Sequence, residues 1–469
     1  MFNFNNTYTK LPGMFYSRQQ PAQNPLAGMV YFNEILANKL RIDINLQNSP
    51  KIFSGDELPK NAAPISQAYA GFQYGRFNVL GDGRAVILGE HITPNGERFD
   101  IQLKGSGRTH YSRGGDGLAA LAPMLREVLI SEFLAAVNIP TTRSLAVVTT
   151  GKDVVRERVL QGAVLTRIAS SHIRVGTFDF ARLMGSADDV KALADYVIWR
   201  HFPHIETYND NHRYLLLLRE AADLQAKLIA QWMNIGFVHG VMNTDNMSIC
   251  GETIDLGPCA FMDAYDPETV FSSIDQHGRY SYKNQPAIGG WNLARFSESL
   301  LPLLSKDKAE AVKLAEIEIN LYATKFDEYW LDEMRGKMGF VGEDSLDAQL
   351  ARDLLEIMHF NKLDFTNTFN TFANSESGNC NSPLQEWLSN WEARLKRHGQ
   401  NVGDAQKNIR QHNPAVIPRN HFVQASLDAA ENGDFKPFSE LLYALCNPYT
   451  FNGKFSTSSS EKYVTFCGT

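Results

Sequence analysis

The stretch that most constrains the fold is residues 237–257, FVHGVMNTDNMSICGETIDLG. It predicts a strand carrying a polar cluster, a tight turn at Gly251, and a second short strand that ends near Asp255. This arrangement would place Asp245, Asn246 and Asp255 on adjoining loops. Carboxylate and amide oxygens are hard ligands that can share one or two Mg²⁺ ions. The stretch therefore predicts a metal site of the kind that binds phosphate.

The same residues match a kinase catalytic loop only in part. A kinase places its catalytic Asp five residues before the metal-binding Asn, and a DFG-type Asp follows on the next hairpin. Here Asn246 and Asp255 fit the two metal positions, but Val241 stands five residues before Asn246. Asp245 is the nearby carboxylate able to replace the missing base. An ordinary polar turn that caps its own backbone is the alternative for this segment taken alone.

Length and composition set the class of protein. A chain of 469 residues with 43% hydrophobic and 21% charged residues is typical of a soluble globular protein with two or more lobes. It has no apolar run of the roughly 18 residues that a membrane span needs and no leader-like start, so we expect a cytoplasmic protein without a membrane partner. A net charge of -7 argues against nucleic acid as a partner.

The cysteines predict neither a zinc site nor a disulfide scaffold. They show no CxxC spacing, and their number is odd. The five are Cys250, Cys259, Cys380, Cys446 and Cys467. Cys467 is third from the end, in a tail expected to leave its thiol accessible.

Residues 1–70 are rich in Asn, Pro and Ser, and we expect an irregular wrapping segment with one short helix near residues 31–39. From Gly71 the pattern is that of strands, with an Asn-Gly hairpin signal at residues 94–96. Apolar and polar residues alternate over residues 99–104, which places Lys104 on the polar face at a strand end.

Two glycine-rich segments flank these strands. Gly81 and Gly83, spaced by one residue, would let the backbone approach a polyphosphate, and Arg84 adds charge. Residues 105–117 hold five glycines and two arginines and end at Asp116 and Gly117. Such a density predicts a loop around an anion, whereas an isolated GDG triplet is more often an ordinary turn.

A helix over about residues 123–137 carries two glutamates, Glu127 and Glu132, either of which could pair with Lys104 as in kinases. Arg167 and Arg174 follow the next strands, and arginine suits bidentate phosphate contacts. The alternative for each glutamate is a solvated charge on an exposed face. The alternative for the two arginines is a salt-bridged pair at the surface.

The chain is mainly helical from about residue 187, with a strong helix over about residues 214–234 and a polar interruption at residues 367–381. We expect an α+β, protein-kinase-like bilobal fold. Its parts would be a small antiparallel β-rich N-lobe (71–180), a larger helical C-lobe (181–400) and a C-terminal helical extension (401–469).

With these motifs assembled, the chain resembles the selenoprotein O family, a pseudokinase-like group of protein adenylyltransferases. The resemblance rests on long strings such as IQLKGSGRTHYSRGGDG, MLREVLISE, GFVHGVMNTDNMSI and GETIDLGPCAFMD. It implies that ATP binds in reverse relative to kinases, with Mg²⁺ or Mn²⁺. AMP would then pass to a Ser, Thr or Tyr hydroxyl of a protein substrate, with release of pyrophosphate.

The resemblance also implies roles for single residues. Asp245 matches the proton acceptor, Asn246 and Asp255 match the metal ligands, and Glu127 matches the partner of Lys104. The nucleotide contacts would be Gly81, Gly83, Arg84, Lys104, Asp116, Gly117, Arg167 and Arg174. Family members with a redox switch pair a C-terminal Cys with one after the DLG-like motif, but residues 269–275 contain no Cys. We therefore do not expect that disulfide here.

Two other functions fit parts of the pattern. A small-molecule kinase of the aminoglycoside-phosphotransferase type would transfer the γ-phosphate, but it requires an Asp where Val241 stands. A noncatalytic scaffold that binds ATP would not need Lys104, Asn246 and Asp255 together.

Overall fold

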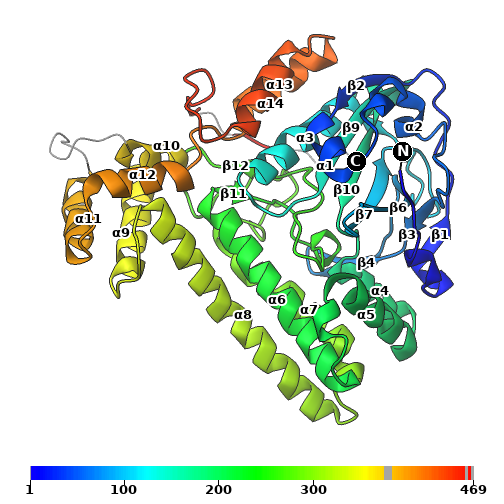
Figure 1. Ribbon diagram of the computed structural model, residues 1–469, viewed down its shortest axis with the longest axis horizontal. Coiled ribbons are helices and arrows are strands. Elements are labelled where there is room, and N and C mark those ends of the chain that lie inside the picture. The colour runs from blue at the N-terminus through cyan, green and yellow to red at the C-terminus, as the bar shows by residue number, and fades with distance from the viewer. Residues whose placement is uncertain (1, 374–382, 460–462, 466–469) are drawn as a thin grey trace.

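The computed structural model describes residues 2–373, 383–459 and 463–465. A β-rich lobe packs against a helical lobe, and a further group of helices lies beyond it (Figure 1). The predicted mixture of an antiparallel sheet and a larger helical part is confirmed.

The β-rich lobe is built on an eight-stranded antiparallel sheet in the order β1-β3-β6-β7-β10-β9-β2, with β8 beside β10. The predicted hairpin is β6 and β7, and Gly96 in its turn has φ +85°. The next two strands, β9 and β10, form the longest pair. The bounds of the strands are Tyr16–Arg18 (β1), Gly28–Phe32 (β2), Ile65–Gln67 (β3), Ala85–Ile92 (β6), Arg98–Lys104 (β7), Ala119–Ala120 (β8), Arg143–Val155 (β9) and Val159–Ala169 (β10).

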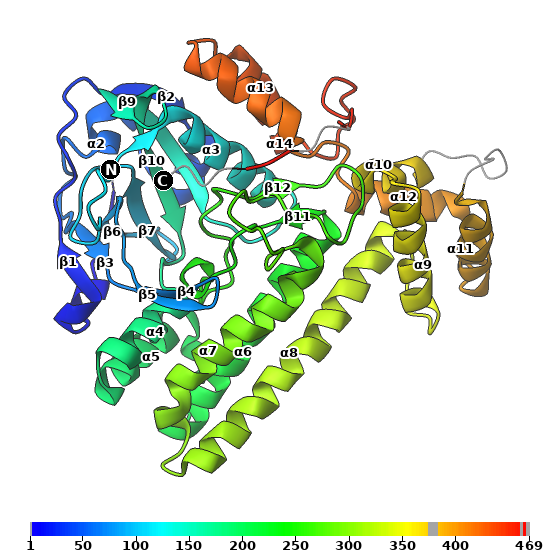
Figure 2. The same cartoon turned by 180° about the vertical axis from the view of Figure 1, so that it is seen from behind.

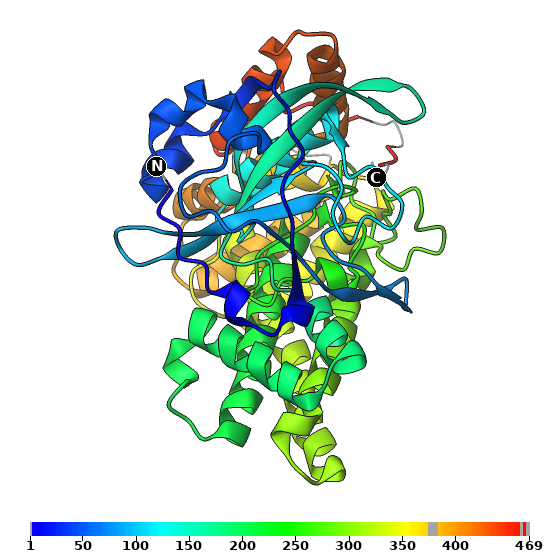
Figure 3. The ribbon, with the colours of Figure 1, turned by 90° about the vertical axis from the view of Figure 1, so that its right-hand side faces the viewer.

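The N-terminal segment differs from the expected irregular chain. Its three strands β1, β2 and β3 form both ends of the sheet, and Figure 3 shows the segment in dark blue running across the lobe. Helices α1 (Glu34–Leu40) and α2 (Pro50–Ser54), which lie between β2 and β3 in the chain, cover one face, where Leu40 and Phe53 share a buried apolar cluster with Leu103. Strands of three residues are too short for a period of two to be recognised in the sequence.

Helix α3 (Leu121–Ala136) covers the other face of the sheet and is buried on nearly all sides. Its predicted apolar residues Leu125, Val128 and Phe133 are fully buried. Glu127 and Glu132 are buried too, and α13 (Asn420–Glu431) and α14 (Lys436–Cys446) pack on the outer side of α3 (Figure 1). A charged residue on this helix therefore needs a partner inside the protein.

The helical lobe begins with helices that lie side by side in Figure 2: α4 (Val175–Met184), α5 (Ala187–His201), α6 (Asp210–Asn234), α7 (Gln285–Leu304) and α8 (Lys308–Lys337). The outer group is α9 (Asp347–Phe360), α10 (Phe365–Phe372), α11 (Gln385–Arg397) and α12 (Val402–His412).

One expectation for the C-terminal half needs correction. The polar stretch 367–381 does not simply interrupt the helices, because residues 367–372 lie in α10; residues 374–382 are outside the described residues. Of the helices that follow, α12 packs on α8, whereas α13 and α14 return to α3. Among the described residues no helix combines the length and the apolar character that crossing a membrane requires.

Candidate active site

The central motif forms a loop between the two lobes. Strand β11 (Phe237–Val238) leads to a short 3-10 helix, Thr244–Asn246. The expected second strand before Asp255 is wrong, since β11 pairs instead with β12 (Ala260–Phe261), which follows Asp255. The segment before Asp255 instead makes an isolated bridge from Thr253 to Thr141, and Asp255 itself leaves the extended conformation, with φ +59°.

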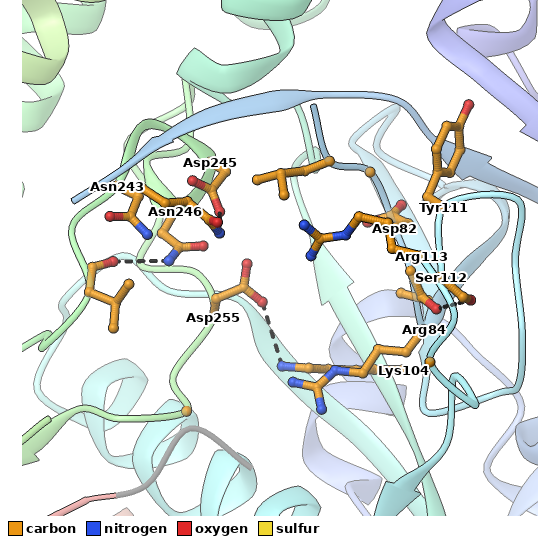
Figure 4. A pocket seen from close by; sticks show the side chains of 18 of the residues that line it. Asp82, Arg84, Lys104, Tyr111, Ser112, Arg113, Asn243, Asp245, Asn246 and Asp255 are labelled. Carbon is orange, nitrogen blue, oxygen red and sulfur yellow. Dashed lines mark hydrogen bonds and ion pairs between the residues drawn. The ribbon is translucent and has the colours of Figure 1, made fainter. Parts of the chain in front are cut away.

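A cavity of about 660 Å³ lies between this loop and the sheet. Every nucleotide, catalytic and metal residue expected from the sequence lines it, and Figure 4 shows several of these side chains facing one another. These lining residues are Gly81, Gly83, Arg84, Lys104, Asp116, Gly117, Arg167, Arg174, Asp245, Asn246 and Asp255. Glu127 lies behind them and contacts the cavity through Lys104.

Lys104 joins the two lobes at the centre of this cavity. Its Nζ lies 2.6 Å from Glu127 Oε2 and 3.5 Å from Asp255 Oδ1. Glu132, the other glutamate considered, instead binds Arg143 at 2.6 Å. The geometry thus pairs Lys104 with Glu127 and not with Glu132.

Asp255 is held by three cations. Besides Lys104, Arg167 Nη1 lies 3.0 Å from Oδ1 and Arg174 Nη1 lies 2.5 Å from Oδ2. Burial alone would raise the pKa of Asp255, but Arg174, Arg167 and Lys104 hold it well below the usual range, so the carboxylate is ionised. Both arginine side chains are only 2% exposed, which rules out a surface salt-bridged pair.

The two glycine-rich segments pack on each other at the far side of the cavity. A Cβ on Gly81 (φ +138°) would lie 2.4 Å from the Tyr111 ring, and one on Gly117 (φ +70°) would lie 2.2 Å from the Gly107 carbonyl. Ser112 Oγ donates to the Gly83 carbonyl (Figure 4). Only glycine fits at these two positions, and the packing fixes the loop around the cavity.

Asp116 sits at the rim, where its side chain is 44% exposed and pairs with Arg156 at 2.7 Å. Its partner was not foreseen from the sequence. Other lining residues that sequence reasoning missed are Tyr111, Ser112, Arg113, Asn243 and Asp82.

Asp82 is the most informative of these, since it is 2% exposed and lies between the two glycines already singled out. Its Oδ1 is 3.8 Å from Arg174 Nη2, and its Oδ2 accepts from the Gln67 amide at 3.1 Å. Burial raises the pKa of Asp82 to about 6, although Arg174 opposes the shift. The sequence feature that could have identified Asp82 as a site residue is its position between Gly81 and Gly83.

Asp245 and Asn246 approach the cavity from the helical lobe. Asp245 is 6% exposed, its Oδ1 has no hydrogen-bond partner, and burial raises its pKa to about 6. Arg174 Nη1 donates to the Asp245 carbonyl at 2.6 Å. The Asn246 amide nitrogen donates to the Val241 carbonyl at 2.9 Å, which directs the amide oxygen toward Asp255 (Figure 4).

These oxygens fit a hard divalent cation. Asn246 Oδ1 and the ionised Asp255 carboxylate are the ligand types that Mg²⁺ and Mn²⁺ take. Within the described residues no group of three His, Cys, Asp or Glu side chains could form a metal cage. A site with two protein ligands is typical of Mg²⁺, which keeps its other positions for water and substrate phosphates.

None of the described thiols, Cys250, Cys259 and Cys446, lines the cavity. Cys259 is buried and Cys250 partly buried, and burial raises the pKa of each to about 12. Cys380 and Cys467 lie outside the described residues. Thr465, which is described, pairs with the segment after the DLG-like motif, its amide donating to the Phe271 carbonyl at 2.8 Å.

Comparison with known proteins identifies the family. The family model described as "Protein adenylyltransferase SelO" matches residues 1–446. A protein named "Protein nucleotidyltransferase YdiU" from Halalkalibacterium halodurans is 55% identical, over 100% of this chain and 98% of its own length. A protein of the same name from Geobacillus kaustophilus is 50% identical, over 100% of this chain and 99% of its own length. The resemblance and the enzyme class expected from the sequence are confirmed: the chain belongs to the protein adenylyltransferase SelO family.

Proposed function

We propose that the protein transfers AMP from ATP to a Ser, Thr or Tyr hydroxyl of another protein and releases pyrophosphate. The observation that carries this proposal is the position of the base. Asp245 lines the cavity directly before Asn246, while the apolar Val241 occupies the position of a kinase base. A base displaced in this way favours an acceptor that meets a phosphate other than the γ-phosphate.

The cations support the reversed orientation of ATP. Arg167 and Arg174 are 2% exposed, whereas Asp255 is 24% exposed, so the two arginines lie deeper than the carboxylate. Phosphate charge is best neutralised by such buried arginines. The β- and γ-phosphates bind inward against these arginines and Lys104, and the α-phosphate remains on the side of Asp245.

The roles of the other residues follow from this orientation. Asn246 and Asp255 would hold Mg²⁺ or Mn²⁺, which when bound neutralises charge on the phosphates. Glu127 keeps Lys104 extended toward the phosphates. Asp245, with a pKa of about 6, can take the acceptor proton near neutral pH.

The protein-kinase-like bilobal fold and its boundaries at residues 71–180 and 181–400 belong to the same proposal. A sheet lobe and a helical lobe that meet at the cavity support them. A protein substrate, the absence of a nucleic-acid partner and a cytoplasmic location also stay predictions.

ATP labelled at the α or the γ position tests the proposal. The protein is incubated with Mg²⁺ or Mn²⁺ and a generic protein acceptor, and the modified peptide is weighed by mass spectrometry. We expect α label and the added mass of AMP on a hydroxyl residue. Incorporation of γ label alone would favour the kinase, and ATP binding without incorporation of either label would favour the scaffold.

A further inference from the structure

The cavity continues past Asp245, away from the glycine-rich segments. Figure 4 shows Asn243, Asp245 and Asn246 on the opposite side of the cavity from Arg84, Tyr111 and Ser112. Gln73 and Tyr74, which contact Asp245 and Asn243, lie at this end, and Ser273 and Ile274 also line the cavity; none of the four was assigned to nucleotide binding. If the proposed function holds, the acceptor hydroxyl must arrive from this end.

A small hairpin forms one wall of this end. Strands β4 (Ala70–Gln73) and β5 (Arg76–Val79) join at Tyr74 and Gly75, which both have positive φ, as a two-residue hairpin turn requires. The tip of the hairpin is therefore tightly shaped.

Hydrogen bonds fix this hairpin on the loop that carries the base. The Phe72 amide donates to Thr244 Oγ1 at 3.0 Å, and the Tyr74 amide donates to Asn243 Oδ1 at 3.2 Å. Asp245 Oδ1 would lie 2.0 Å from a Cβ on Gly71, so the strand and the base are in direct contact. The hairpin therefore defines the approach to Asp245.

Beside the hairpin lies a cation, Arg279, that has no counter-charge among the described residues. Arg279 stacks on the rings of Tyr280 and Trp291, with its guanidinium carbon 5.6 Å and 5.0 Å from their centroids. Its Nη2 lies 3.9 Å from the position of a Cβ on Gly75, at the hairpin tip. Within the described part of the chain, no carboxylate forms an ion pair with Arg279, although the protein carries a net charge of -7.

The carboxylate closest to Arg279 along the chain is already used. Asp275 accepts from the backbone amides of Arg279 and Tyr280 at 2.9 Å and 2.8 Å. Arg295 offers a contrast, because it also stacks on Trp291 at 5.2 Å but pairs with Glu298 at 2.6 Å. As far as the described residues show, Arg295 is neutralised and Arg279 is left to bind an external anion.

Arg279 is also connected to the base. Its neighbour Tyr280 donates from its hydroxyl to Asn243, and the Tyr280 hydroxyl accepts from the Tyr74 amide at 3.2 Å. Asn243 stands two residues before Asp245. The segment that carries Arg279 is therefore tied to the loop that carries the base, and Ile274, which is 54% exposed, lines the same cavity.

We propose that Arg279, held against Trp291 at the tip of the β4–β5 hairpin, binds an Asp or Glu side chain of the acceptor polypeptide beside the hydroxyl that is modified. This inference rests on the proposed function and names its substrate class: a hydroxyl residue flanked by acid. An arginine fork on an aromatic ring is well suited to a carboxylate, since the ring holds the planar guanidinium ready for two hydrogen bonds.

Synthetic peptides test the inference directly. One peptide has a single Ser among Ala and Glu residues, and its matched partner has Gln in place of each Glu. A charge-assisted hydrogen bond is worth about 1.5–3 kcal/mol, so kcat/KM for AMP transfer should favour the acidic peptide by about 10- to 100-fold.

Three variants locate the effect. Arg279→Gln should reduce the preference for the acidic peptide to about 2-fold or less, and Arg279→Lys should leave an intermediate value because it keeps the charge without the fork. Arg295→Gln, the matched control on the same ring, should retain the wild-type preference. ATP titration confirms that each variant is folded and keeps its nucleotide site.

The outcomes distinguish a failure of this inference from a failure of the proposed function. AMP transfer to both peptides at equal rates by the wild type, or a preference that survives in Arg279→Gln, overturns the role of Arg279 and leaves the proposed function standing. Failure of the wild type to transfer AMP to any peptide or protein overturns the proposed function, and the inference falls with it.

Discussion

Replacing Glu127 by Gln tests how the cavity keeps Lys104 in place. Glu127 is 2% exposed and faces two cations, Lys104 at 2.6 Å and Arg167 at 3.3 Å. Gln preserves the shape but removes the charge. Breaking a buried ion pair costs about 3–5 kcal/mol, and we expect the lower end, about 3 kcal/mol, because Asp255 remains beside both cations.

The loss of activity should exceed what this loss of stability explains. Without Glu127, Lys104 is left with Asp255 as its only carboxylate partner among the described residues, and it is drawn away from the phosphates. Loss of one electrostatic contact to a transition state costs about 10²–10³ in rate. We expect kcat/KM for AMP transfer to fall by about 10- to 100-fold, since Lys104 itself is kept.

Glu132→Gln is the matched control on the same helix. Glu132 is also buried and binds Arg143 at 2.6 Å, but that arginine is 25% exposed and lies away from the cavity. This variant should lose about 1–2 kcal/mol of stability and keep its activity. Urea unfolding without nucleotide and transfer from α-labelled ATP, at a temperature where both variants are folded, provide the comparison. Equal kcat/KM for the two variants would refute the role given to Glu127.

Three further predictions concern single residues of the cavity. Asp255→Ala should abolish metal-dependent ATP binding and activity together, whereas Asp245→Ala should keep binding and lower turnover by about 10²–10⁴-fold. Calorimetric titration of each variant with ATP and Mg²⁺ measures the binding. Loss of binding in Asp245→Ala together with retained binding in Asp255→Ala would show that the two roles are inverted. Gly117→Ala should lose ATP binding because its methyl group meets the Gly107 carbonyl, whereas Gly13→Ala, where the methyl meets open space, should keep it. The folded pKa of Asp82 is raised from 3.8 to about 6, so its contribution to stability is present below pH 3.8 and lost as the pH rises through 6. The free energy of unfolding of Asp82→Asn relative to wild type should therefore rise by up to about 3 kcal/mol between pH 4 and pH 7 in urea titrations, and a constant difference would contradict the burial argument.

Local pattern was enough to predict the elements that surround the cavity. Alternation over residues 99–104 predicted strand β7, with Leu103 buried on one face and Lys104 on the other. Helical periodicity predicted α3 and α6. The site residues were recognisable because few residue types bind phosphate and divalent metal, and these occurred within short segments at close spacing.

The contacts that complete the site were decided only by the tertiary structure. Arg174 meets Asp82, 92 positions away in the chain, and Arg279 meets the tip of a hairpin that the sequence did not reveal. Two-residue and three-residue strands such as β12 and β1 have no detectable period, and their pairing depends on a distant partner.

The sequence by itself therefore predicted the residues proposed to carry the chemistry, which line one cavity, and the local elements on which most of them stand. Choosing Glu127 over Glu132 required the packing of α3 on the sheet, and bringing Arg279 to the tip of the β4–β5 hairpin required the packing of one lobe on the other. The physical reason is that a charge or hydrogen bond acts over a few ångströms of space, and sequence patterns report only the neighbours along the chain.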